Sequence, residues 1–140
     1  MPQLARGGKW VFGWSVIGRR RELLIPPVAY LEYGFQPNER VRFLAGSRTS
    51  GGFSIYREAL MAETAIPLEK MELAAGVIGE DGCVQLPPES GVEPGQWLLA
   101  VRGSGRALGF IGRGPIFIEA QRHPELQTFF GREAPERGGG

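Results

Sequence analysis

The chain has 140 residues, of which 42% are hydrophobic, and its 22 glycines and 11 prolines exceed average usage. This composition predicts an all-β protein of one domain, with short strands and frequent turns. No apolar run approaches the roughly eighteen residues that cross a bilayer, and the N-terminus lacks a signal peptide's apolar stretch, so we expect a cytoplasmic protein. The single cysteine, Cys83, excludes an internal disulfide, and one histidine, His123, is too few for an ordinary structural zinc site.

Charge is distributed unevenly along the chain, although the formal net charge is only +1. Residues 1–70 carry ten Lys/Arg against six Asp/Glu, giving +4, and residues 71–140 carry six against nine, giving −3. A basic half is typical of a nucleic-acid face, but charges of this size also arise on ordinary solvated surfaces. Composition alone leaves both interpretations open.

A stretch near the start of the chain recurs 61 residues later. "VIGRRRELLIPP" (16–27) and "VIGEDGCVQLPP" (77–88) share the Val-Ile-Gly start and the Pro-Pro end. After a four-residue deletion the offset becomes 57, pairing "FQPNERVRFLAGSRTSGGF" (35–53) with "VEPGQWLLAVRGSGRALGF" (92–110). So many matched turn positions indicate an internal duplication, with repeat one at residues 10–56 and repeat two at 74–113.

Each repeat predicts the same four short strands in chain order. "WSVIG" and its counterpart "AGVIG" lead into a turn, a second strand ("ELLI"; "CVQL") ends at Pro-Pro, and a third enters a glycine hairpin from which the fourth emerges. Repeat one also has room for a short helix, "VAYLEYG", which repeat two has lost. Alternation in the third strands predicts two buried faces: Val41, Phe43 and Ala45 in repeat one, and Trp97, Leu99 and Val101 in repeat two.

The remaining segments have helical character or none. Residues 57–73 predict a partly helical linker interrupted at Pro67, and residues 114–130 predict a C-terminal helical segment interrupted at Pro124. Residues 131–140, rich in glycine and charge, predict a disordered tail.

The order of these motifs resembles the SpoVT-AbrB (AbrB/MazE-like) family. In repeat one "LLIPPVAYLEYGFQPNERVRFL" holds the family outline of a strand ending in Ile-Pro, a short helix, a turn and an alternating strand. In repeat two "VQLPP" and "GVEPGQWLLAV" hold it without the helix. The resemblance implies a double-split, swapped-hairpin β-barrel in which two repeats of one chain form a pseudo-dimer. Sharing one core also makes physical sense, because a unit of about 45 residues buries too little surface alone.

The resemblance further implies a DNA-binding transcriptional regulator, and the residues add a basic turn. Arg19, Arg20 and Arg21 are consecutive in the first turn, and Arg48 occupies a hairpin tip. Arginines placed in this way are suited to double-stranded DNA, since a guanidinium neutralises phosphates and donates two parallel hydrogen bonds. The plain alternative is a solvated turn, and the matching turn of repeat two carries Glu80 and Asp81, which would repel a phosphate backbone.

The sequence is also compatible with a second class of function. The rival is an antitoxin-like or scaffold module that does not bind DNA specifically and contacts a toxin or another protein through the segment from Gly114 onward. Neither Cys83 with His123 nor the carboxylates of Glu80, Asp81 and Glu89 form a recognisable catalytic set, so we expect no enzyme activity, no cofactor and no metal. Association of the pseudo-dimer into a further homodimer stays open.

Overall fold

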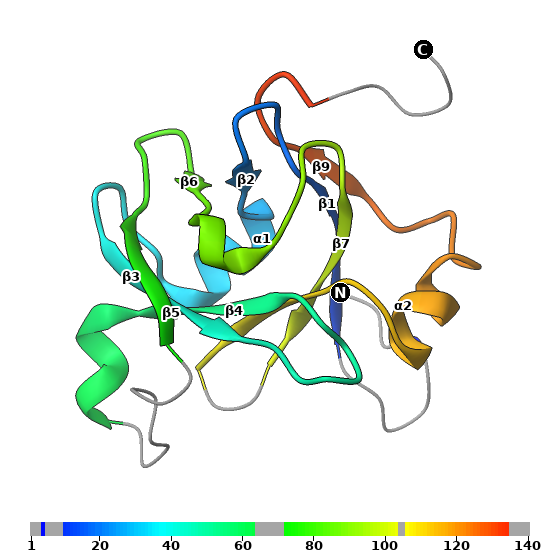
Figure 1. Cartoon of the computed structure of the whole chain (residues 1–140), viewed down its shortest axis with the longest axis horizontal. Helices are drawn as coiled ribbons and strands as arrows, with labels where there is room; N and C mark the ends of the chain where they lie inside the picture. The colour runs from blue at the N-terminus through cyan, green and yellow to red at the C-terminus, as the bar shows by residue number, and fades with distance from the viewer. Residues whose placement is uncertain (1–3, 5–9, 64–71, 104–105, 135–140) are drawn as a thin grey trace.

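The computed structural model describes residues 4, 10–63, 72–103 and 106–134. Over these residues the protein is mostly β, with two short α-helices (Figure 1). The elements of the first half are β1 (Val11–Val16), β2 (Glu22–Leu24), α1 (Pro27–Tyr33), β3 (Arg40–Ala45), β4 (Phe53–Arg57) and the 3-10 helix η1 (Glu58–Glu63). The second half contains β5 (Glu72–Val77), β6 (Cys83–Gln85), the 3-10 turn η3 (Pro88–Ser90), β7 (Trp97–Arg102), β8 (Leu108–Ile111), α2 (Pro115–Ala120) and β9 (Thr128–Phe130).

The two Pro-Pro motifs each begin a helical turn. Pro27 occupies the first turn of α1, where a missing N–H is tolerated, and Gly34 ends the helix in the left-handed region at φ 76°. Pro88 and Gly91 (φ 70°) do the same for η3. The deletion in repeat two therefore shortens the helix to one 3-10 turn.

Strands of the two halves are interleaved in one mixed sheet. Its order is β5-β3-β4-β8-β7-β1-β9, so β1 pairs with β7 of the other half and β3 pairs with β5. Every ladder is antiparallel except β1 with β9. Strands β2 and β6 pair with each other in a separate two-stranded sheet. Neither half has a complete sheet of its own.

The strand registers follow the two sequence offsets. Val16 pairs with Trp97 and Val77 pairs with Arg40, positions related by offsets of 61 and 57. Phe53 pairs with its own equivalent, Phe110, where β4 meets β8. Left-handed backbone recurs at equivalent positions too, and this links three pairs: Arg21 (φ 60°) with Gly82 (82°), Asn38 (65°) with Gly95 (83°), and Gly34 with Gly91. Positions matched by the two sequence offsets therefore occupy corresponding places in the strand pairing and in the turns.

The closed barrel expected from the resemblance is not seen in the described residues. The seven-stranded sheet has two ends, β5 and β9, and no ladder joins them. Strands β2 and β6 form a ladder with each other, and an isolated bridge between Ile78 and Val84 joins β6 to the residue after β5, but no bridge within the described residues joins either strand to β9. The architecture of the described residues is thus an open mixed sheet with a small second sheet across one end.

The main hydrophobic core draws on both halves of the chain. At its centre the rings of Phe53 and Phe110 stack, with centroids 5.3 Å apart, and both side chains are at most 1% exposed. Residues of both repeats surround them, including Leu23, Ile25, Val41, Phe43, Ile55, Ile78, Val84, Leu98 and Leu108. The expected sharing of one core between the repeats is borne out at this level.

One of the two predicted core faces lies elsewhere. The offset of 57 equates Val41 with Leu98 and Phe43 with Ala100, and these four residues line the main core. The predicted face of β7 packs on the opposite side of the sheet, in a second cluster beneath α2, and consists of half-buried Trp97 with buried Leu99 and Val101. Because β7 is covered on both faces, its alternation could not indicate which face met the main core. Ala45, also predicted to be buried, is exposed.

The C-terminal segment is helical only in its first part. Residues 115–120 form α2, and the chain then turns and adds β9 to the edge of β1, where Gly131 N–H donates to Val16 O at 2.8 Å. Residues 131–134, expected to begin a disordered tail, are held in place, since Arg19 N–H donates to Arg132 O at 3.0 Å. The rest of that tail, 135–140, lies outside the described residues.

The linker between the repeats is described in part. Residue 57 is the last of β4, residues 58–63 form η1, and residues 64–71, which include Pro67, lie outside the described residues. No helix in the described part of the chain is long and apolar enough to cross a membrane.

Candidate nucleic-acid interface

The predicted arginine turn joins β1 to β2 at one end of the molecule. Gly18 N–H donates to Glu22 O at 2.8 Å and Arg21 N–H donates to Gly18 O at 3.0 Å, which closes the turn. Arg19 and Arg20 lie at its tip and are exposed. Neither side chain forms an ion pair with a described residue, so both guanidinium groups are available to an anion.

Arg21 has a different role from its two neighbours. Its Nε donates to the carbonyl of Val92 at 3.2 Å, and its guanidinium lies 3.9 Å from a carboxylate oxygen of Glu93. Both partners belong to repeat two. Arg21 therefore joins the turn to the loop after η3, and of the three predicted arginines only Arg19 and Arg20 form no ion pair with a described residue.

The acidic turn of repeat two lies at the opposite end of the β2–β6 pair from the arginine turn. Because β2 and β6 are antiparallel, each turn meets the far end of the other strand: Leu86 N–H donates to Arg21 O at 2.9 Å, and Ile25 N–H donates to Gly82 O at 3.2 Å. Asp81 Oδ1 accepts from Cys83 N–H at 3.1 Å, which fixes the carboxylate. Arg132 joins the two turns into one surface, because its carbonyl accepts from Arg19 N–H at 3.0 Å and its guanidinium pairs with Asp81.

Arg132 connects the arginine turn to the acidic turn. This role was not predicted from the sequence. Its guanidinium lies 3.2 Å from Glu22 Oε2 and also pairs with Asp81. The hydrogen bond from Arg132 holds the pKa of the Asp81 carboxyl below its usual value. Since Asp81 and Arg132 are 51 residues apart and Arg132 lies outside both repeats, no local signal identified the pair.

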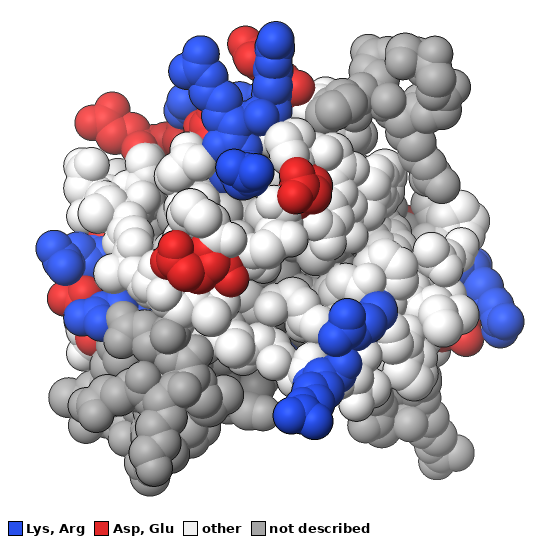
Figure 2. Space-filling view, viewed as in Figure 1, with Lys and Arg blue, Asp and Glu red and all other residues white. Residues whose placement is uncertain are grey.

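Positive and negative side chains are therefore mixed at this end of the molecule (Figure 2). Arg19 and Arg20 project from a surface in which the other charges are largely paired or acidic. The arginines of this surface are Arg19, Arg20, Arg21 and Arg132, and the carboxylates around them are Glu22, Glu80, Asp81 and Glu93. Any polyanion would meet a narrow basic tip rather than a broad basic face.

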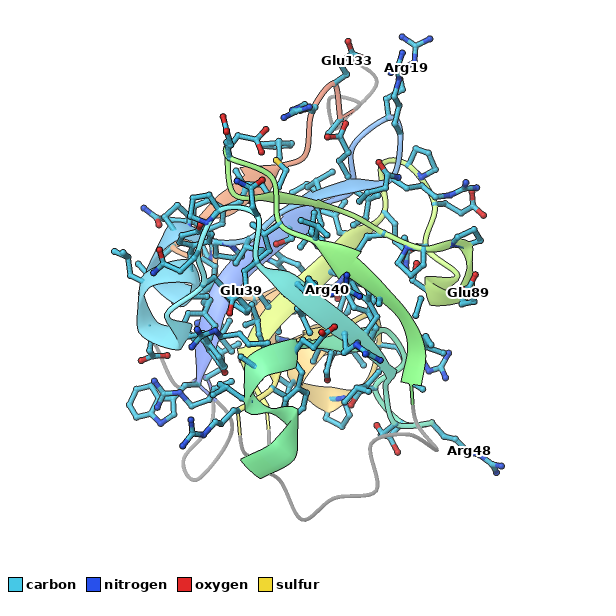
Figure 3. All side chains as sticks on the ribbon, turned by 90° about the vertical axis from the view of Figure 1, so that its left-hand side faces the viewer. Arg19, Glu39, Arg40, Arg48, Glu89 and Glu133 are labelled. Atoms are coloured by element: carbon cyan, nitrogen blue, oxygen red, sulfur yellow. The ribbon has the colours of Figure 1, made fainter. Side chains whose placement is uncertain are left out.

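Arg48 does not join the arginine turn. It is exposed in the hairpin between β3 and β4, and Figure 3 shows Arg19 and Arg48 at opposite ends of the molecule. Near Arg48 a second arginine, Arg113, donates from Nε and Nη2 to the Arg48 carbonyl at 3.1 and 2.8 Å. The four predicted DNA-binding residues thus lie at two separate places on the surface, the arginine turn and the Arg48 hairpin. The tip of the Arg48 hairpin contains no acidic residue.

The two residues considered for catalysis, Cys83 and His123, are respectively buried and hydrogen-bonded in the structure. Burial raises the pKa of the Cys83 thiol to about 11, which disfavours the thiolate. His123 lies between two carboxylates, 2.7 Å from Glu125 Oε1 and 3.0 Å from Glu119 Oε2, and their hydrogen bonds raise its pKa. No group of three or more His, Cys, Asp or Glu side chains in the described part of the chain is arranged to hold a metal ion.

An aromatic cleft of about 440 Å³ lies between α2 and the sheet. The rings of Trp14, Trp97 and Phe117 line it, and Trp14 meets Trp97 and Phe117 edge-on at centroid distances of 5.7 and 5.1 Å. Trp14 is only 7% exposed. Its ring therefore serves packing between α2 and the sheet, and it offers no free face on which a base could stack.

Comparison of the chain with protein-family models, with curated proteins and with solved structures finds no match.

Proposed function

We propose that this chain is a DNA-binding transcriptional regulator built as a tandem SpoVT-AbrB-like (AbrB/MazE-like) fold. The strand exchange supports the proposal, since β1 of repeat one pairs with β7 of repeat two, and β5 of repeat two pairs with β3 of repeat one. A swapped hairpin has this pattern, with each repeat sending its first strands into the sheet of the other. The self-equivalent pairs Phe53 with Phe110 and Leu23 with Val84 mark the two-fold axis of such a pseudo-dimer.

The observation that best supports DNA binding is the pair of exposed guanidinium groups, those of Arg19 and Arg20, at the tip of the β1–β2 turn. Arg19 and Arg20 are exposed and outside any ion pair among the described residues, whereas Arg21 and Arg132 hold carboxylates. Guanidinium groups on a protruding turn can approach a phosphate backbone closely and bind it in bidentate geometry. We therefore assign the DNA contact to Arg19 and Arg20 and a supporting role to Arg21.

The surrounding carboxylates limit the affinity and make the contact one-sided. Two neutralised phosphates give a slope of about −1.8 in log affinity against log salt concentration, at about 0.9 per phosphate. Glu80 and Asp81 occupy the turn related by the two-fold axis, so the second repeat supplies no matching contact. The expected complex is a weak, salt-sensitive one in which a single turn touches the duplex.

The test is a titration of labelled duplex DNA at several salt concentrations. Replacing Arg19 and Arg20 together by alanine should flatten the slope by about 1.8 units and leave the melting temperature nearly unchanged, because exposed turn charges contribute little to stability. Arg48→Ala removes the same kind of charge at the far end and is the matched control, which should leave the slope unaltered. Absence of binding by the wild type at low salt, or equal effects per arginine in the variant and the control, would overturn the proposal.

One observation favours the rival function, a protein-interaction module that does not bind DNA specifically. The carboxylates of Glu22 and Asp81 lie beside the basic tip, and an alternating acidic and basic surface suits a protein partner better than a polyanion. The segment from Gly114 onward, however, already packs on β1 through α2 and β9. If the DNA titration fails, the mixed surface is the place to seek a partner such as a toxin.

A further inference from the structure

The aromatic cleft between α2 and the sheet has the size of a small-molecule site. Its volume of about 440 Å³ falls within the range of about 300–1,000 Å³ that is usual for such sites. Its walls come from β1, β7, α2 and residues 121–128, so the fold builds it from segments far apart in the sequence. The DNA contact proposed above lies at the β1–β2 turn and uses none of the lining residues. The cleft is therefore a separate candidate site.

Three aromatic rings contribute to the walls of the cleft. Trp14 is 7% exposed, whereas Trp97 and Phe117 are half-buried. The rings of Trp97 and Phe117 are steeply inclined to the ring of Trp14, with interplanar angles of 66° and 85°. The cleft thus presents aromatic surface from more than one direction. Such walls suit a ring-shaped ligand, because aromatic rings pair well in edge-to-face and offset geometries.

The charged groups around the cleft are already paired with one another. His123 lines the cleft, and its two ring nitrogens lie 2.7 Å from Glu125 Oε1 and 3.0 Å from Glu119 Oε2. These hydrogen bonds raise the pKa of His123, which favours its protonated form, and Arg122 lies 3.7 Å from the second oxygen of Glu119. Two positive groups are thus set against two carboxylates. A charged ligand would find no unpaired counter-ion among these groups to offset the cost of leaving water.

Two uncharged polar side chains of the lining remain for hydrogen bonds to a ligand. Gln121 follows α2 and Thr128 begins β9, and neither side chain forms a hydrogen bond with a described residue. An amide and a hydroxyl can each donate and accept. His123, by contrast, has both ring nitrogens engaged by carboxylates. The side-chain hydrogen bonds that the cleft offers are therefore those of neutral groups.

We propose that this cleft binds a small uncharged aromatic compound with one group that both donates and accepts hydrogen bonds, such as a carboxamide. The ring of the ligand packs against the aromatic walls, and its polar group lies toward Gln121 and Thr128. A charged aromatic ligand binds more weakly, because its charge is removed from water without a counter-ion. A purely apolar ring also binds more weakly, because it displaces water from the two polar side chains without replacing their hydrogen bonds.

The probes are four compounds that share a phenyl ring: benzamide, benzoate, benzylammonium and toluene. Each is titrated into the full chain, and NMR follows the indole N–H signals of the three tryptophans. Trp14 and Trp97 line the cleft, whereas Trp10 does not and serves as an internal control. Benzamide should shift the signals of the two lining tryptophans and leave that of Trp10 unchanged. Its affinity should exceed that of each other probe by about fivefold or more.

Three variants assign the contacts. Phe117→Leu removes an aromatic wall and should weaken the binding of benzamide and toluene alike. Ile118→Ala is the matched control, because this neighbouring side chain of α2 is 55% exposed and does not line the cleft, so the affinity should stay at the wild-type value. Thr128→Val exchanges the hydroxyl for a methyl group of similar shape. It should weaken benzamide about threefold to tenfold and leave the affinity for toluene unaltered.

Several results would overturn the proposal. They are an unchanged position of both lining tryptophan signals at the solubility limit of benzamide, equal affinity for benzamide and either charged probe, and a Thr128→Val protein that binds benzamide like the wild type. Equal losses in Phe117→Leu and Ile118→Ala would also overturn it, since they would place the site outside the cleft. If Phe117→Leu does not fold, the wild-type titrations and Thr128→Val decide.

Discussion

The stacked rings at the two-fold axis give the sharpest test of a core shared between the repeats. Phe53→Ala removes a side chain that is 1% exposed and stacks on Phe110. Loss of a fully buried phenylalanine costs about 3–5 kcal/mol, out of a typical total stability of about 5–15 kcal/mol. Phe110→Ala should cost about the same, because the two rings occupy equivalent positions. Urea unfolding monitored by circular dichroism and by tryptophan fluorescence measures both changes.

The two probes also report whether the repeats unfold together. Trp14 and Trp97 lie on the far side of the sheet, so coincident transitions with an unchanged m-value indicate one cooperative unit. Leu31→Ala is the control, because its side chain is 80% exposed and the change should stay within about 0.5 kcal/mol. A Phe53→Ala protein in which the fluorescence transition stays at the wild-type midpoint while the circular dichroism shifts would refute the shared core.

A double-mutant cycle isolates the ring contact itself. Phe53→Leu and Phe110→Leu keep apolar bulk and remove the aromatic stack, so their combined effect should differ from the sum of the single effects by about 0.5–1.5 kcal/mol. Additivity within about 0.3 kcal/mol would show that the rings do not interact as the geometry requires.

Three other predictions follow from particular contacts. A fragment of residues 1–70 should be unfolded or self-associated, because β7 and β5, the partners of its strands, belong to the other half; a monomeric fragment with a cooperative melt in circular dichroism would contradict this. Burial raises the pKa of Tyr33 to about 12 from 10.0, so its contribution to stability should be complete below pH 10 and lost as the pH rises through about 12; the stability difference between wild type and Tyr33→Phe, which also lacks the hydrogen bond to Ala107 O, should be constant below pH 10 and change only above it. The Cys83 thiol, buried and with its pKa raised to about 11, should react with a disulfide reagent far more slowly in the native protein than in urea, and equal rates would place it at the surface.

The residues of the turns were informative because their physical demands are local. Gly34 and Gly91, at the ends of the two Pro-Pro segments, and the strands that flank them could be placed from spacing alone, since left-handed backbone and a proline-fixed φ depend on a few neighbouring residues. The repeat added the stronger signal. Matching turn residues at fixed offsets indicated that two halves share one core before any contact was known, because neither half is long enough to bury its own.

The site was harder to predict because its charges come from distant parts of the chain. Arg19, Arg20 and Arg21 look identical in the sequence, yet Arg21 is held by the Val92 carbonyl and only its neighbours are free. Arg132 reaches the same surface through a strand, β9, that is three residues long and lies parallel to a strand more than a hundred residues earlier. Local patterns carry no information about such a pairing.

The sequence by itself determined the duplication, the short strands and turns, and the sharing of one core, since each depends on periodicity, glycine and proline chemistry, or chain length. Tertiary structure alone decided which face of β7 meets that core, where the acidic turn lies relative to the arginine turn, and which sheet edge the chain covers. These features depend on how segments far apart in the sequence meet, as the pairing of β9 with β1 illustrates. Strand pairing is non-local, and the energy that selects one partner over another appears only when both are packed in place.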